Sequence, residues 1–132
     1  MKQTLEFSSC AENLAKVRAF VRQFLGCTSL AECDAELLVL GVDEACSNII
    51  RHAYQRHAES QPIILCCEQL RKGVRFKLRD FGNQINPATF NGRPIDRIEP
   101  GGLGLHLMRR AFDHVDYTLK KSGTELVLTK RI

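Results

Sequence analysis

The chain has 132 residues, 44% of them hydrophobic and 26% charged, which is the balance of one compact domain with a buried core. Its formal charge of +4 is far below the basic clustering of a dedicated nucleic-acid-binding protein. No apolar run approaches the roughly 20 residues of a membrane helix, and the N-terminus lacks the apolar core of a secretion signal. We therefore expect a single cytoplasmic domain over residues 1–132 that contacts neither membrane nor nucleic acid directly.

Six cysteines are spread over the chain, at positions 10, 27, 33, 46, 66 and 67. None belongs to a Cys-x-x-Cys pair, and no histidine cluster accompanies them at the spacing of a zinc site. We interpret all six as reduced thiols, most of which act as small buried hydrophobic residues. A structural disulfide is the alternative that the composition leaves open.

The first half of the chain predicts one short strand and two helices. Weak alternation in residues 4–7 is typical of an edge strand. Apolar residues at helical spacing predict a first helix that begins near Ala11 and is ended by Gly26. A second helix, with one continuous apolar face, is expected over residues 30–54. It is long for a small domain, which leaves a bend near Gly41 open.

A predicted hairpin and a long loop follow. Residues 62–69 read as a strand, and residues 74–80 alternate strictly between apolar and charged side chains, as in a strand with one face on the core. Residues 81–101 have no periodicity and contain three of the four prolines. A connection of roughly twenty residues without structure is typical of disorder or of a functional lid.

The C-terminal part predicts a helix over residues 102–112 and two strands, residues 115–119 and 124–130, joined by a turn. The strands therefore cluster in hairpins, and the helices are expected to cover one face of the sheet. This order predicts an α+β two-layer sandwich with a mixed, mostly antiparallel sheet and three helices on one face.

Two polar side chains mark the second predicted helix. Glu44 and Asn48 are four residues apart, so they lie one turn above the other on the flank of the apolar face. A carboxylate and a carboxamide would thus project together from a half-buried helix. Taken alone, the pair has a plainer interpretation as an exposed helical polar pair.

Two glycine-containing segments are further candidates for ligand contacts. Asp80 ends a predicted strand and is followed by Phe81 and Gly82. A carboxylate there can accept a hydrogen bond from an exocyclic amine, and glycine lets a ligand lie against the backbone. Residues 101–105 are glycine-rich and open a helix, where free N–H groups favour phosphates. The alternatives are a simple turn and a flexible hinge.

The order of these motifs resembles a known family. The chain looks like the ATP-binding fold shared by gyrase, sensor histidine kinases and MutL, called the Bergerat or GHKL fold. Within it, the chain is most similar to the small stand-alone anti-sigma-factor serine kinases. The matching motifs are residues 44–54, 80–83, 101–105 and 123–124.

The resemblance implies a role for each matching residue. Glu44 would be the general base that takes the proton from an attacking serine hydroxyl. Asn48 would bind the Mg²⁺ that bridges the ATP phosphates. Asp80 would accept a hydrogen bond from the adenine amino group, with Gly82 giving room for the base and Thr124 supporting it.

The same resemblance assigns the phosphate end of the site. Gly102, Leu103 and Gly104 would offer backbone N–H groups to the phosphates of ATP or ADP, and residues 81–101 would form the ATP lid. Arg93 and Arg97 in that loop either reach the γ-phosphate or remain solvated charges.

The resemblance also implies the activity and its partners. The protein would use Mg²⁺ and ATP to phosphorylate a small STAS-type anti-anti-sigma protein and would sequester an RNA polymerase sigma factor. It would be a homodimer, with the N-terminal strand and the first helix at the interface. Gln84 stands where many members have the second glycine of Asp-x-Gly-x-Gly. The alternative is therefore a nucleotide-binding docking module with little or no kinase activity.

Overall fold

The computed structural model describes residues 1–54, 61–84 and 102–132, with the side chains of residues 32, 33 and 102–106 left out of the description. The strands are β1 (Lys2–Ser8), β2 (Pro62–Leu70), β3 (Gly73–Asp80), β4 (His114–Leu119) and β5 (Thr124–Arg131). The helices are α1 (Leu14–Leu25), α2 (Glu32–Asn48) and α4 (Gly102–Ala111). A 3₁₀ turn, η1 (Ala11–Asn13), precedes α1, and a π-helical turn, η2 (Ile49–Ala53), continues α2.

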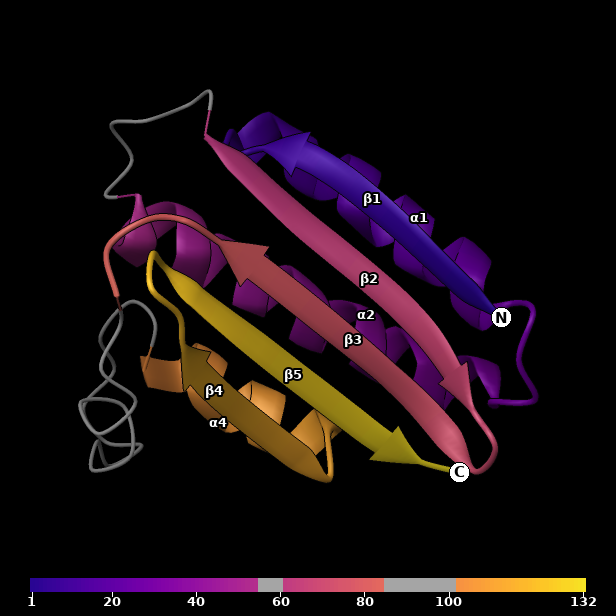
Figure 1. Cartoon of the computed structure of the whole chain (residues 1–132). Coiled ribbons are helices and arrows are strands. Elements are labelled where there is room, and N and C mark those ends of the chain that lie inside the picture. The colour runs from indigo at the N-terminus through magenta and orange to yellow at the C-terminus, as the bar shows by residue number, and fades with distance from the viewer. Residues whose placement is uncertain (55–60, 85–101) are drawn as a thin grey trace.

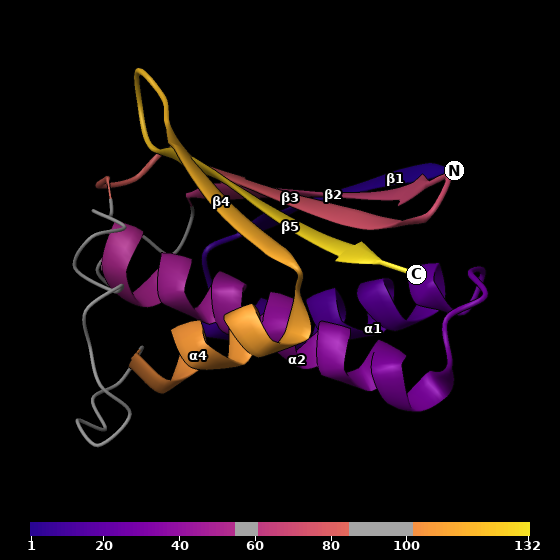
Figure 2. The same cartoon turned by 90° about the horizontal axis from the view of Figure 1, so that it is seen from below.

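All five strands form one sheet in the order β1-β2-β3-β5-β4 (Figure 1). Every neighbouring pair is antiparallel. The pairs β2–β3 and β4–β5 are hairpins, β1 runs antiparallel to β2, and β5 runs antiparallel to β3. The three helices cover one face of the sheet (Figure 2). The predicted α+β two-layer sandwich with three helices on one face is confirmed, but the described sheet is wholly antiparallel and not mixed as expected.

The central strand β3 shows how the sequence pattern builds the core. Its alternating apolar side chains, Val74, Phe76 and Leu78, are fully buried against the helices. The Phe76 ring packs edge-on against Phe24 of α1 and against Phe112 at the end of α4, with 5.9 Å between ring centroids in both pairs. One strand thereby anchors both outer helices.

Helix α2 lies between α1 and α4 and contacts both (Figure 2). It stays helical through Gly41, so the helix is not broken there. A Cβ atom at Gly41 would lie 2.7 Å from Cε2 of Phe112, so this glycine serves close helix packing. The departure from α-helical geometry comes instead in η2, where the Tyr54 N–H donates to the Ile49 carbonyl at 3.1 Å. Such π-turns are frequent at functional sites.

The cysteines confirm one part of their interpretation and correct another. The five whose side chains are described carry free thiols. Only Cys46 and Cys67 are buried, and burial raises the pKa of the Cys67 thiol to about 12. Cys27 is exposed, so the expectation that most cysteines are buried is wrong. Among the described helices, none is long and apolar enough to cross a membrane.

Candidate functional site

Three segments that are far apart in sequence meet at one end of the sheet (Figure 1). Asp80 ends β3, and Thr124 begins β5 directly opposite it in the strand register. The end of η2 reaches the same place, because the Asn83 N–H donates to the Ala53 carbonyl at 2.7 Å. The structure therefore brings together Asp80, Gly82 and Thr124, as the sequence motifs predict.

Asp80 is the buried carboxylate of this site, with 2% of its surface exposed. Burial raises the pKa of the Asp80 carboxyl above its ordinary value of 3.8. The backbone N–H groups of Gly82 and Thr124 donate to the carboxylate and oppose this shift, and the bond from Gly82 to Oδ1 is 3.1 Å long. A desolvated carboxylate of this kind is a strong acceptor for a neutral N–H donor of a ligand.

Thr124 adds a second polar group beside Asp80. It is 3% exposed, and its hydroxyl has no hydrogen-bond partner among the described residues. Buried hydroxyl groups nearly always have a partner, so one without a partner calls for an explanation such as a bound water or ligand. A carboxylate and a free hydroxyl on adjacent strand ends thus mark a place for a polar ligand.

The backbone around Asp80 is held against η2. A Cβ atom at Gly82 would lie 2.5 Å from the Ala53 carbonyl oxygen and 2.8 Å from Cδ1 of Tyr54. Glycine is therefore required for this close approach, a reason that the sequence alone does not reveal. The Tyr54 hydroxyl donates to the Pro62 carbonyl at 2.7 Å and accepts from the Phe81 N–H at 2.8 Å.

Gln84 makes specific contacts at the position where the resemblance has a glycine. Its Nε2 donates to the carbonyl oxygens of Lys120, at 2.6 Å, and Gly123, at 3.1 Å. Gly123 has a φ of 76° and packs against Asp80 and Phe81. Gln84 thus ties the segment that follows β3 to the β4–β5 turn.

Glu44 and Asn48 lie on the part of α2 that leads into η2, and a third residue joins them. The terminal nitrogen Nη2 of Arg51 donates to Oε1 of Glu44 at 3.0 Å and to Oδ1 of Asn48 at 2.7 Å. Glu44 is half-buried, whereas Asn48 is only 6% exposed. The two predicted oxygen atoms therefore face one common point. Sequence reasoning missed Arg51, although positions 44, 48 and 51 share the i, i+4, i+7 spacing of one helix face.

These oxygen donors suit a hard cation such as Mg²⁺, which prefers oxygen ligands and usually takes only one or two from a protein. In the described ranges, no cluster of three or more His, Cys, Asp or Glu side chains could hold a metal ion. The Asn48 carboxamide and the neighbouring Glu44 carboxylate fit such a cation, which would be shared with phosphates.

The phosphate end of the predicted site is described in part. Helix α4 begins at Gly102, so Gly102, Leu103 and Gly104 lie in its first turn. N–H groups of a first helical turn have no acceptor within the helix and suit an anion. The predicted lid, residues 81–101, is described only up to residue 84. Its remainder, which includes Arg93 and Arg97, lies outside the described residues.

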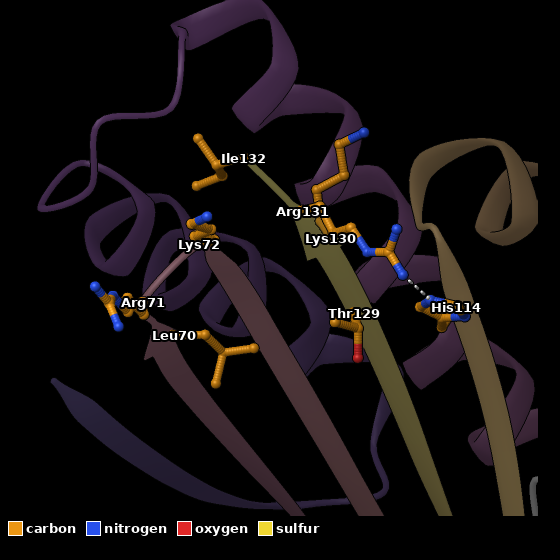
Figure 3. A pocket seen from close by; sticks show the side chains of 8 residues that line it. All are labelled: Leu70, Arg71, Lys72, His114, Thr129, Lys130, Arg131 and Ile132. Atoms are coloured by element: carbon orange, nitrogen blue, oxygen red, sulfur yellow. Dashed lines mark hydrogen bonds between the residues drawn. The ribbon is translucent and has the colours of Figure 1, made fainter.

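A hollow lies at the opposite end of the sheet from Asp80 (Figure 3). It has a volume of about 580 Å³ and is lined by the β2–β3 turn, the end of β5 and His114. Its charged groups include Lys72 and Arg131, which are exposed, and the Arg131 guanidinium lies 3.1 Å from Nε2 of His114. Solvated cations of this kind need no ligand, so volume alone does not make this hollow a site.

The fold and the convergent motifs define a class of nucleotide-binding domain. Residues 7–130 match the family described as the histidine kinase-like ATPase domain, and the chain belongs to this family. Membership implies that the domain uses a nucleotide, and it confirms the resemblance drawn from the motifs.

Within this family, the chain is similar to several serine-protein kinases. Serine-protein kinase RsbW of Bacillus cereus strain AH187 is 25% identical over 138 aligned positions, which cover 99% of this chain and 85% of that protein. RsbW of Bacillus mycoides strain KBAB4 has the same identity and coverage. RsbW of Bacillus anthracis strain CDC 684 / NRRL 3495 is 24% identical.

Solved structures share the fold. The crystal structure of the RsbU and RsbW domains of Rv1364c from Mycobacterium tuberculosis matches with a TM-score of 0.73 and 17% identity, over 99% of this chain and 32% of that one. The histidine kinase domain of a blue-light activated kinase from Erythrobacter litoralis matches with a TM-score of 0.62 and 15% identity, over 95% of this chain and 61% of that one. The chain thus spans less than two thirds of either structure.

Proposed function

We propose that the protein is an anti-sigma factor and serine-protein kinase. It uses Mg²⁺ and ATP to phosphorylate a STAS-type anti-anti-sigma protein, and it sequesters a sigma factor. The observation that carries the proposal is the buried Asp80 carboxylate beside the Thr124 hydroxyl, which has no partner in the described part of the chain, at the end of a helix that brings Glu44 and Asn48 together. The names of the curated relatives support the kinase assignment.

Asp80 and Thr124 suit the adenine end of ATP or ADP. The buried carboxylate accepts a hydrogen bond from the exocyclic amine of adenine, and the ligand offers a partner to the Thr124 hydroxyl, which has none among the residues that the structure describes. Guanine presents a carbonyl oxygen where adenine has its amine. Two acceptors would then face each other without a proton between them, so the site discriminates against guanine.

Glu44 and Asn48 suit the phosphate end. The Asn48 oxygen would hold a bound Mg²⁺, which would supply charge neutralisation for the phosphates. The serine Oγ of the partner attacks the γ-phosphorus, its proton passes to the Glu44 carboxylate, and the bond to ADP breaks. Gly102, Leu103 and Gly104 offer first-turn N–H groups of α4 to the phosphates. Arg93 and Arg97 are proposed to approach the γ-phosphate.

A regulatory role follows from the same proposal. The sigma factor and the STAS protein would compete for overlapping surfaces, and phosphorylation of the STAS protein would release it. The protein would act as a homodimer through β1 and α1. β1 lies at an edge of the sheet, where its outer side is available for pairing.

The runner-up function is a docking module that binds ADP or ATP without turnover. Gln84 favours this function. It stands where many members of the family that the chain resembles have glycine, and its two hydrogen bonds to Lys120 and Gly123 restrain the backbone there. This module would regulate a partner by contact alone.

The variant Glu44→Ala separates the two functions. If Glu44 is the general base, phosphorylation of a STAS-type protein with labelled ATP falls by about a hundredfold or more, while ADP affinity stays within about threefold. The control is Asp43→Ala, which removes the neighbouring carboxylate that pairs with Arg18 on another side of α2. A kinase activity that is equal in wild type and Glu44→Ala, or that is absent from folded wild-type protein, contradicts the enzyme proposal.

A further inference from the structure

Arg51 occupies the point on which the predicted base and the predicted metal ligand converge. Its Nη2 carries two hydrogen atoms and donates to two acceptors, Oε1 of Glu44 and Oδ1 of Asn48. The Arg51 side chain is 19% exposed. The guanidinium therefore supplies a positive charge between the two oxygen atoms that the proposed function needs.

A second ion pair on α2 shows that this arrangement is specific. Arg18 of α1 contacts Oδ1 of Asp43 at 2.9 Å, and that pair joins two helices. Arg51, in contrast, adds the buried carboxamide of Asn48 to its contact with a carboxylate. The bond to Asn48, at 2.7 Å, is the shorter of its two, and a charge-assisted bond to a buried oxygen is among the stronger hydrogen bonds.

We propose that Arg51 is a built-in cation that holds Glu44 and Asn48 together before nucleotide binds, and that it competes with the divalent cation for the Asn48 oxygen atom. This inference rests on the proposed function, which gives Glu44 and Asn48 their roles. A guanidinium and a divalent cation at the same oxygen repel each other strongly, because their charges are alike and close. Arg51 therefore leaves Asn48 when the cation arrives.

The structure offers the guanidinium room to move. Arg51 also lines a cavity of about 410 Å³ between η1 and the end of α2, whose wall includes Ser9, Cys10 and Ser47. The Nε of Arg51 is buried and makes no hydrogen bond within the described part of the chain. The contacts of Arg51 with Glu44 and Asn48 both come from Nη2. A rotation of the Arg51 side chain therefore releases Oε1 of Glu44 and Oδ1 of Asn48 together.

The test is ADP binding measured by calorimetry over a series of Mg²⁺ concentrations. Arg51→Gln is neutral but still polar. In this variant, the Mg²⁺ concentration that produces half of the Mg²⁺-dependent increase in ADP affinity falls by roughly tenfold relative to wild type. Arg51→Met gives the same direction and guards against a folding defect in the first variant. Arg51→Lys keeps the charge and stays within about threefold of wild type.

The matched control is Arg18→Gln, which removes the guanidinium that pairs with Asp43 of α2 and leaves the Mg²⁺ dependence unchanged. An unchanged or increased Mg²⁺ requirement in both neutral Arg51 variants overturns the inference, because the guanidinium then does not compete with the cation. If folded wild type binds no ADP at any Mg²⁺ concentration, the proposed function itself fails. The two failures are therefore distinguished within one series.

Discussion

The two ends of strands β3 and β5 differ in how their polar groups are satisfied. At one end, the Asp80 carboxylate and the Thr124 hydroxyl are buried, and the hydroxyl has no partner among the described residues. At the other end, Lys72 and Arg131 stand in solvent around a hollow of about 580 Å³ (Figure 3). Both ends belong to the same pair of strands, so the sheet itself does not make the difference.

A buried polar group without a hydrogen-bond partner marks a binding site better than the volume of a hollow does. A charge in water already has its hydrogen bonds, so a ligand gains little by replacing them. A buried acceptor and a buried hydroxyl lose their water on folding and gain most from a ligand that restores the bonds. The end of the sheet at Asp80 is therefore the candidate nucleotide site.

The largest effect is expected from Gly82→Ala, which tests whether backbone packing builds this end. The new Cβ would lie 2.5 Å from the Ala53 carbonyl oxygen, so the chain must move and the free energy of unfolding falls by about 2–4 kcal/mol. Urea denaturation measures this loss. The control is Gly26→Ala at the end of α1, where the nearest atom would be 3.4 Å away. There, the change is within about 1 kcal/mol, and an equal loss in both variants would contradict the packing argument.

Thr124→Val tests the buried hydroxyl at the start of β5, for comparison with a threonine near the other end of the same strand. Valine has the shape of threonine without its hydroxyl, so the protein without nucleotide gains up to about 1 kcal/mol in unfolding free energy. ADP affinity falls by roughly five- to tenfold, because the ligand loses a hydrogen bond. These opposite changes are measured by denaturation and calorimetry.

The control for this variant is Thr129→Val, at the half-exposed end of β5. Its unfolding free energy changes by no more than about 0.5 kcal/mol, and ADP binding does not change. A clear loss of stability in Thr124→Val would show that the hydroxyl has a partner within the protein.

The pH dependence of stability gives the smallest effect and has opposite signs at the two ends. Burial raises the pKa of Asp80, so between its ordinary value of 3.8 and the higher folded value the folded state binds more protons than the unfolded state. The stability contribution of Asp80 therefore decreases as pH rises through this window. At the other end, the Arg131 N–H lowers the pKa of Asp113. The contribution of Asp113 is present above 3.8 and is lost as pH falls below it.

Thermal unfolding of wild type, Asp80→Asn and Asp113→Asn over acidic pH measures these signs. The stability of Asp80→Asn relative to wild type rises with pH, whereas that of Asp113→Asn falls. The same sign for both variants would mean that Asp80 is not desolvated as the structure indicates.

The sequence predicts the elements well because their signals are local. The strict alternation of β3 and the apolar face of α2 follow from side-chain periodicity within a single element. The motif order then places Asp80, Gly82 and Thr124 at one end of the sheet, where strand register brings them together. The elements follow from local patterns, whereas the meeting of Asp80 and Thr124 across two strands is expected from the family resemblance that the motif order carries.

Two further features depend on contacts between distant segments. Gly41 looks like a break in a helix, yet its role is set by Phe112, far along the chain. Gln84 reads as a departure from a glycine motif, but its side chain binds carbonyl groups 36 and 39 residues away. Periodicity does not reveal these two pairings. Arg51 differs, because its i, i+4, i+7 spacing with Glu44 and Asn48 is a local signal, although no local pattern predicts the π-turn in which it lies.

Calorimetric titration of ADP and ATP, with and without Mg²⁺, into wild type and Asp80→Asn measures whether this end of the sheet binds a nucleotide. We expect Mg²⁺-dependent binding to wild type and a loss of about a hundredfold or more in Asp80→Asn, because the buried acceptor for adenine is gone. Equal binding to both proteins, or no binding to folded wild type, would contradict the assignment of this end of the sheet as a nucleotide site.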